Sequence, residues 1–279
     1  MLPVSVSKVD KIRTILDREP VNITNGQFWY VNNTVALKET AGKTLFGHIQ
    51  DYIKKYPIVY DFIVDHLSAV KSSAKFNRVQ KSLIEKYNQT DVVVSYGSGP
   101  KVYFGRSDIV NVDLFAFDCV DVIIDTNSIL PFVDNSVDYI ISIAVLEHVA
   151  HPSVMVSEMF RCLKPGGEAL IFVPFIQPIH AAPNDYHRWT PSGLRELFRQ
   201  FNVVQLGVGA GPTSGLLWVF QHWIATLLSF GSSTIKDILL ILLTITLFPI
   251  KYIDVILEHF GRGEDIASGY FIHCERPMD

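Results

Sequence analysis

The feature that most limits the fold is a series of short, unbroken apolar runs in the middle of the chain. These runs cover residues 92–94, 109–114, 120–124, 137–143 and 169–173. Continuous apolar runs, as opposed to alternating ones, are typical of strands buried on both faces of a parallel sheet. Helical patterns at about 152–163 and 191–201 separate the later runs. This order predicts an α/β fold with a doubly wound, Rossmann-like, mainly parallel sheet.

The remaining segments predict how the chain is divided. Two last runs, 203–208 and 269–274, suit an antiparallel edge of the sheet, and the apolar stretch between them is an insertion over 212–262. Residues 1–69 form an N-terminal extension, with a hairpin turn at Asn25-Gly26 and helices from residue 45 onward. The domain that carries the sheet then spans 70–279.

Charge and cysteine content exclude several classes of protein. The formal net charge is -4, which gives no electrostatic reason to expect a nucleic-acid partner. The cysteines, Cys119, Cys162 and Cys274, lie far apart and not at zinc-ligand spacing. The N-terminus has no apolar core of a signal peptide. These features predict a cytoplasmic protein with reduced thiols.

Residues suited to a nucleotide follow three successive strands. Gly97 and Gly99 come directly after the first run, where glycine lets the backbone approach a ligand closely. Asp113 ends the second run, where a carboxylate can accept hydrogen bonds from ribose hydroxyls. Asp125 ends the third and could accept from an adenine amino group. Each acid alone could be a helix cap or a solvated loop residue, but ligands of such sheets bind at these strand ends.

Three segments carry a resemblance to a known family. They are Asp125–Phe132 (DTNSILPF), Val137–His148 (VDYIISIAVLEH) and Glu158–Gly167 (EMFRCLKPGG). At this spacing the chain resembles the class I S-adenosylmethionine (SAM)-dependent methyltransferases of the methyltransferase 11 type. The resemblance covers about residues 91–209 and, more loosely, the final strand.

The resemblance implies SAM as cofactor and a role for each residue at the first two strand ends. Gly97 and Gly99 would line the methionine and ribose parts, and Asp113 would hold the ribose. Family members usually carry an acid two positions before the first glycine, where this chain has Ser95. The connections 97–108 and 115–119 are also short, so we expect the first crossover helix to be brief and the second to be absent.

The same resemblance assigns the residues at the next strand ends. Asp125 and Thr126 would flank the adenine. Ala144 and the turn that contains Glu147 would close the pocket beside the sulfonium.

The acceptor side is expected in the loop 174–189, which is rich in polar side chains. Histidine suits proton removal at neutral pH, so His180, His187 and His148 are the candidate catalytic residues. The alternative is a structural role, in which an Asp185–Arg188 pair locks the loop.

The apolar insertion 214–260 predicts a membrane contact or a packing surface. Its two apolar segments, 215–230 and 238–250, are shorter than the roughly 20 residues of a spanning helix. A helical hairpin in one leaflet, or an interfacial pair, fits their length. The alternative is a cap on the domain or on a second subunit in a homodimer. A protein peripheral to the membrane would suit a lipid or lipid-linked glycan acceptor.

The sequence therefore predicts a SAM-dependent methyltransferase that acts on a small-molecule, lipid or lipid-linked glycan acceptor. The alternative is a non-catalytic relative that serves as a binding or scaffold protein, which Ser95 favours. A dinucleotide-dependent oxidoreductase is disfavoured because Val102 stands at the third glycine position of that fingerprint. No metal is expected, since the N-terminal hairpin lacks the cysteines with which similar modules hold zinc.

Overall fold

A computed structural model describes residues 8–31, 52–53, 56, 62–100, 106–125, 129–180, 184–260 and 263–278. Its strands are β1 Asn22–Thr24, β2 Gln27–Trp29, β3 Val93–Tyr96, β4 Val110–Asp113, β5 Val122–Ile123, β6 Val137–Ile143, β7 Leu163–Pro174, β8 Asn202–Ala210 and β9 Gly269–Glu275. Its α-helices are α1 Lys8–Ile15, α4 Ala74–Lys86, α5 Pro152–Cys162, α6 Pro191–Leu197, α7 Pro212–Leu228, α8 Ser233–Leu247 and α9 Asp254–Leu257. Short helical turns are η1 Ile63–Leu67, η3 Leu146–His148, η4 Phe248–Ile253 and η5 Gly263–Ile266.

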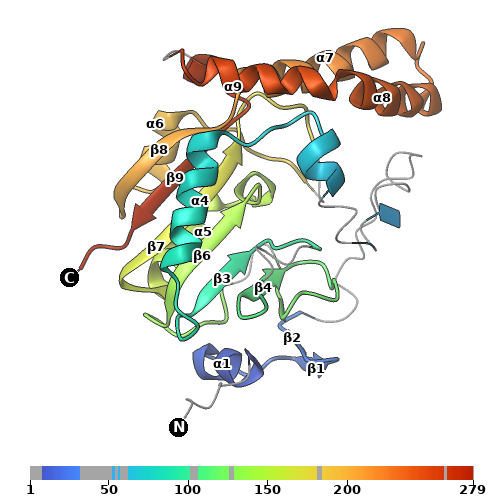
Figure 1. Cartoon of the computed structure of the whole chain (residues 1–279). Helices are drawn as coiled ribbons and strands as arrows, with labels where there is room; N and C mark the ends of the chain where they lie inside the picture. Colours follow the sequence, from blue (N-terminus) through green and yellow to red (C-terminus); the bar gives the residue numbers. More distant parts are fainter. Residues whose placement is uncertain are drawn as a thin grey trace.

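The strands form one sheet in the order β1-β2-β5-β4-β3-β6-β7-β9-β8 (Figure 1). Strands β3 to β7 pair in parallel, and β9 pairs antiparallel with both β7 and β8. The doubly wound, mainly parallel sheet is thereby confirmed. The antiparallel strand β9 is inserted beside the edge strand β8. The order runs from β3 outward in both directions, so the topological switch point lies between β3 and β6.

Helices cover both faces of the sheet. Strand residues alternate between the two cores: Val93 packs in the cluster with Phe76 of α4, and Val94 packs in the other cluster. That second cluster includes Ile12 of α1, Met159 of α5 and residues of α6. Burial on both faces is why these strands read as unbroken apolar runs.

The N-terminal hairpin extends the sheet. Asn25 (φ 53°) and Gly26 (φ 80°) form its turn, as the Asn-Gly pair predicts. Strand β2 pairs in parallel with β5, so the extension is continuous with the sheet. The fully described segment 114–121 contains turns and no helix, as expected for the short second connection. The division into 1–69 and 70–279 stays a prediction.

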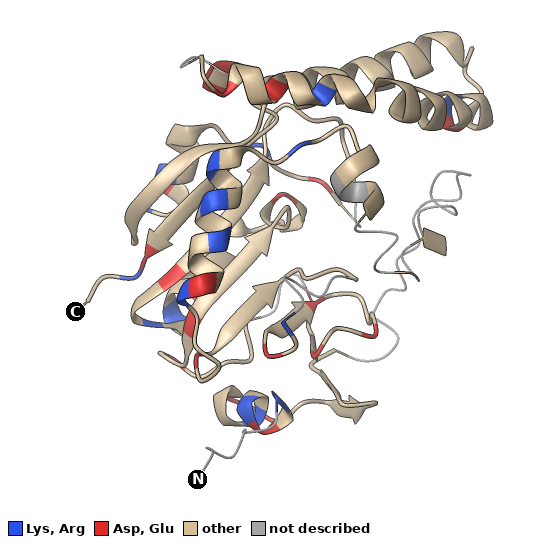
Figure 2. Cartoon of the chain, viewed as in Figure 1, with Lys and Arg blue, Asp and Glu red and all other residues tan. Residues whose placement is uncertain are grey.

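The insertion between β8 and β9 is a helical hairpin of α7 and α8, which stands away from the sheet (Figure 1). Few residues of α7 and α8 are charged, as the ribbon colours in Figure 2 show. Large exposed apolar residues include Leu216, Trp223, Leu227, Phe230, Leu242 and Ile245. The helical stretch Ser233–Leu257 is long and apolar enough to cross a membrane, judged only by length and composition.

Candidate functional site

The candidate cofactor site lies at the carboxyl ends of β3 to β6. Strand β3 pairs with β4 on one side and with β6 on the other. The segments that follow β3 and β6 therefore meet at the switch point, where open α/β sheets bind ligands. Gly97 and Ala144 are the first residues after these two strands.

The glycine turn after β3 has a backbone that side chains rarely adopt. Gly97 has φ 69° and Gly99 has φ 60°. A Cβ on Gly97 would lie 2.3 Å from a methyl carbon of Val145, which follows β6. A Cβ on Gly99 would meet no described atom within 4 Å. Gly97 thus serves close packing at the switch point, while no described atom crowds Gly99.

Asp113, at the end of β4, holds this turn in place. Its Oδ2 accepts a hydrogen bond from the backbone N–H of Gly99 at 2.7 Å, and its Oδ1 accepts from Phe115 at 2.9 Å. The Asp113 carboxylate thereby ties the end of β4 to the turn after β3. Ser95, in β3, is buried.

Asp125 lies near Asp113. Burial is the main cause that raises the pKa of Tyr96, and the charges of Asp113 and Asp125 add to it. The carbonyl of Asp113 accepts from the N–H of Ile124, the residue before Asp125, at 3.0 Å, so the two acids lie at neighbouring strand ends. Thr126 lies outside the described residues, so the structure does not place it.

The turn after β6 closes the other side of the switch point. Ala144 has φ 56°, which is rare for a residue with a side chain, and its N–H donates to Phe172 at 2.9 Å. Strained backbone of this kind is common at functional sites. It directs Val145 onto Gly97 and leads into η3, which carries Glu147 and His148.

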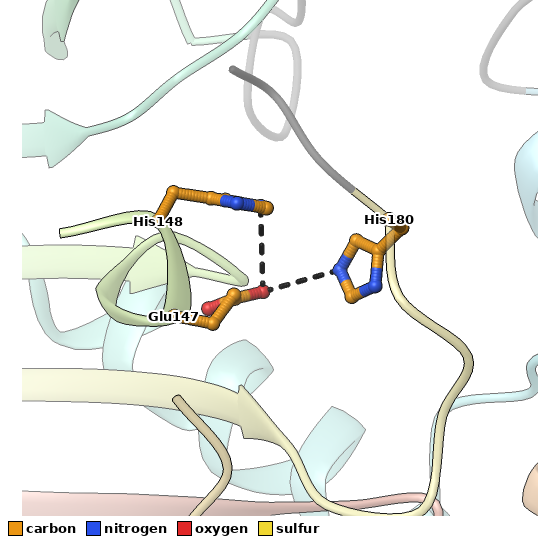
Figure 3. A group of neighbouring side chains, drawn as sticks. All are labelled: Glu147, His148 and His180. Carbon is orange, nitrogen blue, oxygen red and sulfur yellow. Dashed lines mark ion pairs between the residues drawn. The ribbon is translucent and has the colours of Figure 1, made fainter. Parts of the chain in front are cut away.

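Glu147, His148 and His180 form a cluster beside this turn (Figure 3). Glu147 is fully buried, and its Oε1 lies 3.5 Å from Nε2 of His180 and 3.7 Å from Nε2 of His148. Burial alone would lower the pKa of His180, but the carboxylate of Glu147 and the carbonyl of Pro178 outweigh it and raise that pKa.

The acceptor loop is fixed over this cluster by its own contacts. Arg188 pairs with both oxygens of Asp185, which holds the pKa of that carboxyl down at about 2. Asp185 also accepts from the N–H of His180 at 2.9 Å, and Tyr186 donates its N–H to the carbonyl of Glu147 at 2.7 Å. The Asp185–Arg188 pair therefore has the structural role that the sequence analysis kept as an alternative.

His187 does not join the cluster of His148 and His180. Its Nε2 lies 3.4 Å from the carbonyl of Ala150, and its ring lies 5.3 Å from that of Trp189. The described part of the chain places no reactive group beside His187, so its catalytic role stays a prediction.

Sequence reasoning missed a residue that links the insertion to the site. The ring of Trp218, in α7, lies 5.4 Å from the ring of His180. The insertion and the acceptor loop lie apart in sequence, and no local pattern indicates their contact. A surface groove near Lys75, Arg78 and Lys86 lies elsewhere, between α4 and β8, and belongs to neither part of the site.

Comparisons with known proteins found one family model and a set of solved structures. The family model described as "Methyltransferase domain" matches residues 102–171. No curated protein matches the chain.

Several solved structures have a similar fold. A phosphoethanolamine N-methyltransferase 2 of Haemonchus contortus, solved with S-adenosyl-L-methionine, is 17% identical, with a TM-score of 0.49 over 85% of this chain and 61% of that chain. A putative sarcosine dimethylglycine methyltransferase of Galdieria sulphuraria is 13% identical, with a TM-score of 0.47 over 78% and 97%. The [4+2]-cyclase SpnF is 15% identical, with a TM-score of 0.45 over 81% and 97%. Likenesses at this level indicate nothing about the acceptor of this chain.

The sequence motifs, the sheet order and the family match are consistent with one another. Residues 102–171 run from the segment before β4 into β7 and include Asp113, Ala144 and Glu147. The part of the chain that runs from before β4 into β7 therefore matches a methyltransferase domain.

Proposed function

We propose that this chain binds SAM at the switch point and transfers its methyl group to an apolar or lipid-like acceptor. The observation that carries the proposal is the convergence of the predicted cofactor residues on one edge of the sheet. The glycine turn after β3, Asp113 after β4 and the Ala144–Glu147 turn after β6 all lie at the carboxyl ends of adjacent strands.

The residues present fit the cofactor. No described atom crowds Gly99, which would let a ligand approach the backbone, and the carboxylate of Asp113 at the end of β4 has the chemistry to accept from ribose hydroxyls. Asp125 would reach the adenine. Ser95 is short and uncharged, so the amino group of the cofactor would need another partner or a water molecule.

When bound, SAM supplies an electrophilic methyl group on a sulfonium. The residues of this chain orient the acceptor in line with that group and exclude water. The acceptor atom forms the new bond to the methyl carbon, the carbon–sulfur bond breaks, and its electron pair stays on sulfur. An N–H or O–H acceptor must also lose a proton. The Glu147–His148–His180 cluster, beside the loop expected to meet the acceptor, would assist the loss of this proton.

The apolar hairpin supports a lipid-like acceptor. Trp218 connects α7 with His180 of the acceptor loop, so the apolar surface of the insertion begins at the reaction site. An acceptor held in a membrane could reach the site along this surface without crossing water. Exposed tryptophan and phenylalanine, here Trp223 and Phe230, are typical of residues at a membrane interface.

Although the helical stretch Ser233–Leu257 is long enough to cross a bilayer, the contacts at its end favour entry of the hairpin into one leaflet. At 15 residues, α8 is about 22 Å long, compared with a hydrocarbon core of about 30 Å. The helical turns after it are fixed to the domain: Lys251 is fully buried and donates to the carbonyl of Ser68 at 3.0 Å, and Asp254 is buried too. A charged residue held in this way anchors the base of the hairpin to the protein.

Calorimetric titration of the full chain with SAM and with S-adenosylhomocysteine tests the cofactor site. We expect binding of both ligands and a loss of at least about tenfold in affinity in Asp113→Ala, since Asp113 would lose its contacts with the ribose and the glycine turn. Asp118→Ala is the matched control, because Asp118 is exposed in the same region. A folded chain that binds neither ligand would favour the scaffold alternative.

The acceptor class needs a separate experiment. The purified chain is incubated with SAM labelled on its methyl group and with either a lipid extract or a water-soluble metabolite extract. The proposal expects label in the lipid fraction. Label in the water-soluble fraction alone would reject the lipid acceptor and leave the methyltransferase assignment intact.

A further inference from the structure

The Glu147–His148–His180 cluster contains a buried carboxylate without hydrogen bonds. Glu147 is 0% exposed, and neither of its carboxylate oxygens has a hydrogen-bond partner among the described residues. A buried carboxylate that lacks hydrogen bonds is costly. Its nearest polar neighbours are the Nε2 atoms of His148 and His180, at ion-pair distances.

The other ring nitrogen of each histidine, Nδ1, already has a hydrogen-bond partner. Nδ1 of His148 lies 2.6 Å from the carbonyl oxygen of Asn184, and Nδ1 of His180 lies 3.1 Å from that of Pro178. A carbonyl oxygen can only accept, so each Nδ1 carries the proton. In the neutral rings, both Nε2 atoms therefore present a lone pair, and both face the same carboxylate oxygen (Figure 3).

This arrangement is the one that proteins build around metal ions. Histidine ligands commonly donate their second ring N–H to a backbone carbonyl, which fixes the tautomer and directs the other nitrogen at the metal. At metal–ligand lengths of about 2.0–2.2 Å, two ligands of a tetrahedral ion lie about 3.3–3.6 Å apart. The 3.5 Å and 3.7 Å distances from Glu147 to the two imidazoles are close to that value.

We infer that Glu147, His148 and His180 form a binding site for a divalent ion of the zinc type. Two imidazoles and one carboxylate suit Zn²⁺ better than Mg²⁺, which prefers an oxygen-only shell. Three protein ligands leave a fourth position open, as in catalytic zinc sites. The sequence led us to expect no metal anywhere in the chain, so this site departs from that expectation, whose argument concerned only the cysteine-free N-terminal hairpin.

This metal site would add to the proposed function. Its catalytic role rests on that proposed function, but metal binding does not. An acceptor hydroxyl or water on the open position would have a lowered pKa, because the ion stabilises the oxyanion. The proton would then leave to solvent, since both Nε2 atoms are ligands. Metal binding itself requires neither SAM nor an acceptor.

The test measures the metal alone on the full chain. The protein is stripped with a chelator, dialysed against Zn²⁺, and its metal content is measured by mass spectrometry. We expect one ion per chain in the wild type and an affinity more than about 100-fold weaker in His180→Ala, since losing a ligand costs more than losing an outer-shell partner. His187→Ala is the matched control, because His187 lies on the same loop but outside the cluster.

Two further readouts keep the result interpretable. Co²⁺ in the site should give the visible absorption of a tetrahedral complex, and Zn²⁺ should raise the unfolding temperature of the wild type and of His187→Ala but not of His180→Ala. A folded wild type that retains no zinc, or zinc binding unaffected by His180→Ala, overturns the inference. SAM titration of the same preparations separates this failure from failure of the proposed function.

Discussion

Asp254 and Ser214 are joined by two hydrogen bonds: Oδ2 of Asp254 accepts from the backbone N–H of Ser214 at 3.0 Å and from its hydroxyl at 2.7 Å. Oδ1 accepts from the N–H of Thr213 at 2.7 Å. The N-cap residue of α7 is Gly211, which has no side chain, so a carboxylate from α9 caps the helix instead. A negative charge at a helix N-terminus is favourable.

This cap predicts that Asp254 stabilises the base of the hairpin. Asp254→Ala should lower the free energy of unfolding by about 2 kcal/mol, since two N–H groups of α7 lose a charged acceptor. Asp254→Asn keeps one carbonyl oxygen and should lose about half as much. Urea denaturation measures both. Asp265→Ala, at an exposed acid in η5, is the control, and an equal loss there would reject the capping role.

Replacing each of the two glycines at the switch point with alanine should cause a different loss of stability. Gly97→Ala should destabilise the fold by about 3 kcal/mol or more, because it combines positive φ with a clash against Val145. Gly99→Ala has the same backbone strain but no clash, so we expect about 1 kcal/mol and, in addition, weaker SAM binding.

Chemical denaturation and SAM titration of both variants check this contrast. Val145→Ala in the Gly97→Ala background should recover part of the lost stability, because it removes the clashing methyl groups. Equal stability of the two glycine variants would show that packing at Gly97 is not the constraint.

Glu168 predicts a pH-dependent contribution to stability. Burial alone would raise its pKa, but hydrogen bonds with His273, at 2.6 Å, and with Lys86 outweigh burial and lower it below the ordinary 4.5. A lowered pKa means that the stabilisation is present above about pH 4.5 and is lost as the pH falls through the pKa in the folded protein.

Glu168→Gln should therefore lower the free energy of unfolding by about 1–2 kcal/mol at pH 7, and the difference from the wild type should shrink below about pH 4.5. Urea denaturation across this pH range measures it. Glu85→Gln is the control, because Glu85 is exposed in a surface pair with Lys81 and should matter little. A difference that stays constant with pH would contradict the assignment.

Local sequence patterns predicted the strands of the sheet because a strand buried on both faces appears as an unbroken apolar run. The run 137–143 coincides with β6, and the Asn25-Gly26 pair forms the hairpin turn. No sequence pattern indicated that β9 lies between β7 and β8, because an apolar run does not specify which strands pair with it. The sequence therefore predicted the strands and their class more fully than their order.

One part of the candidate site could likewise be predicted from the sequence, and another part could not. Gly97 and Asp113 follow strands, so their meeting at the switch point follows from the fold class. The pairing of Glu147 with His180 does not, because it depends on the path of the acceptor loop, which Tyr186 ties to the carbonyl of Glu147. The contact of Trp218 with His180 likewise depends on how the insertion returns to the sheet.

The apolar hairpin predicts binding to lipid vesicles. Replacing Trp223, Leu227 and Phe230 with glutamate should weaken vesicle binding by at least about tenfold, because each side chain is exposed and its burial in lipid is worth roughly 1–3 kcal/mol. Co-sedimentation with phosphatidylcholine vesicles measures the bound fraction. Val154→Glu, at an exposed apolar residue of α5, is the matched control and should bind as the wild type does. If the wild type stays in the supernatant as a dimer, the hairpin covers a second subunit and the membrane contact is rejected.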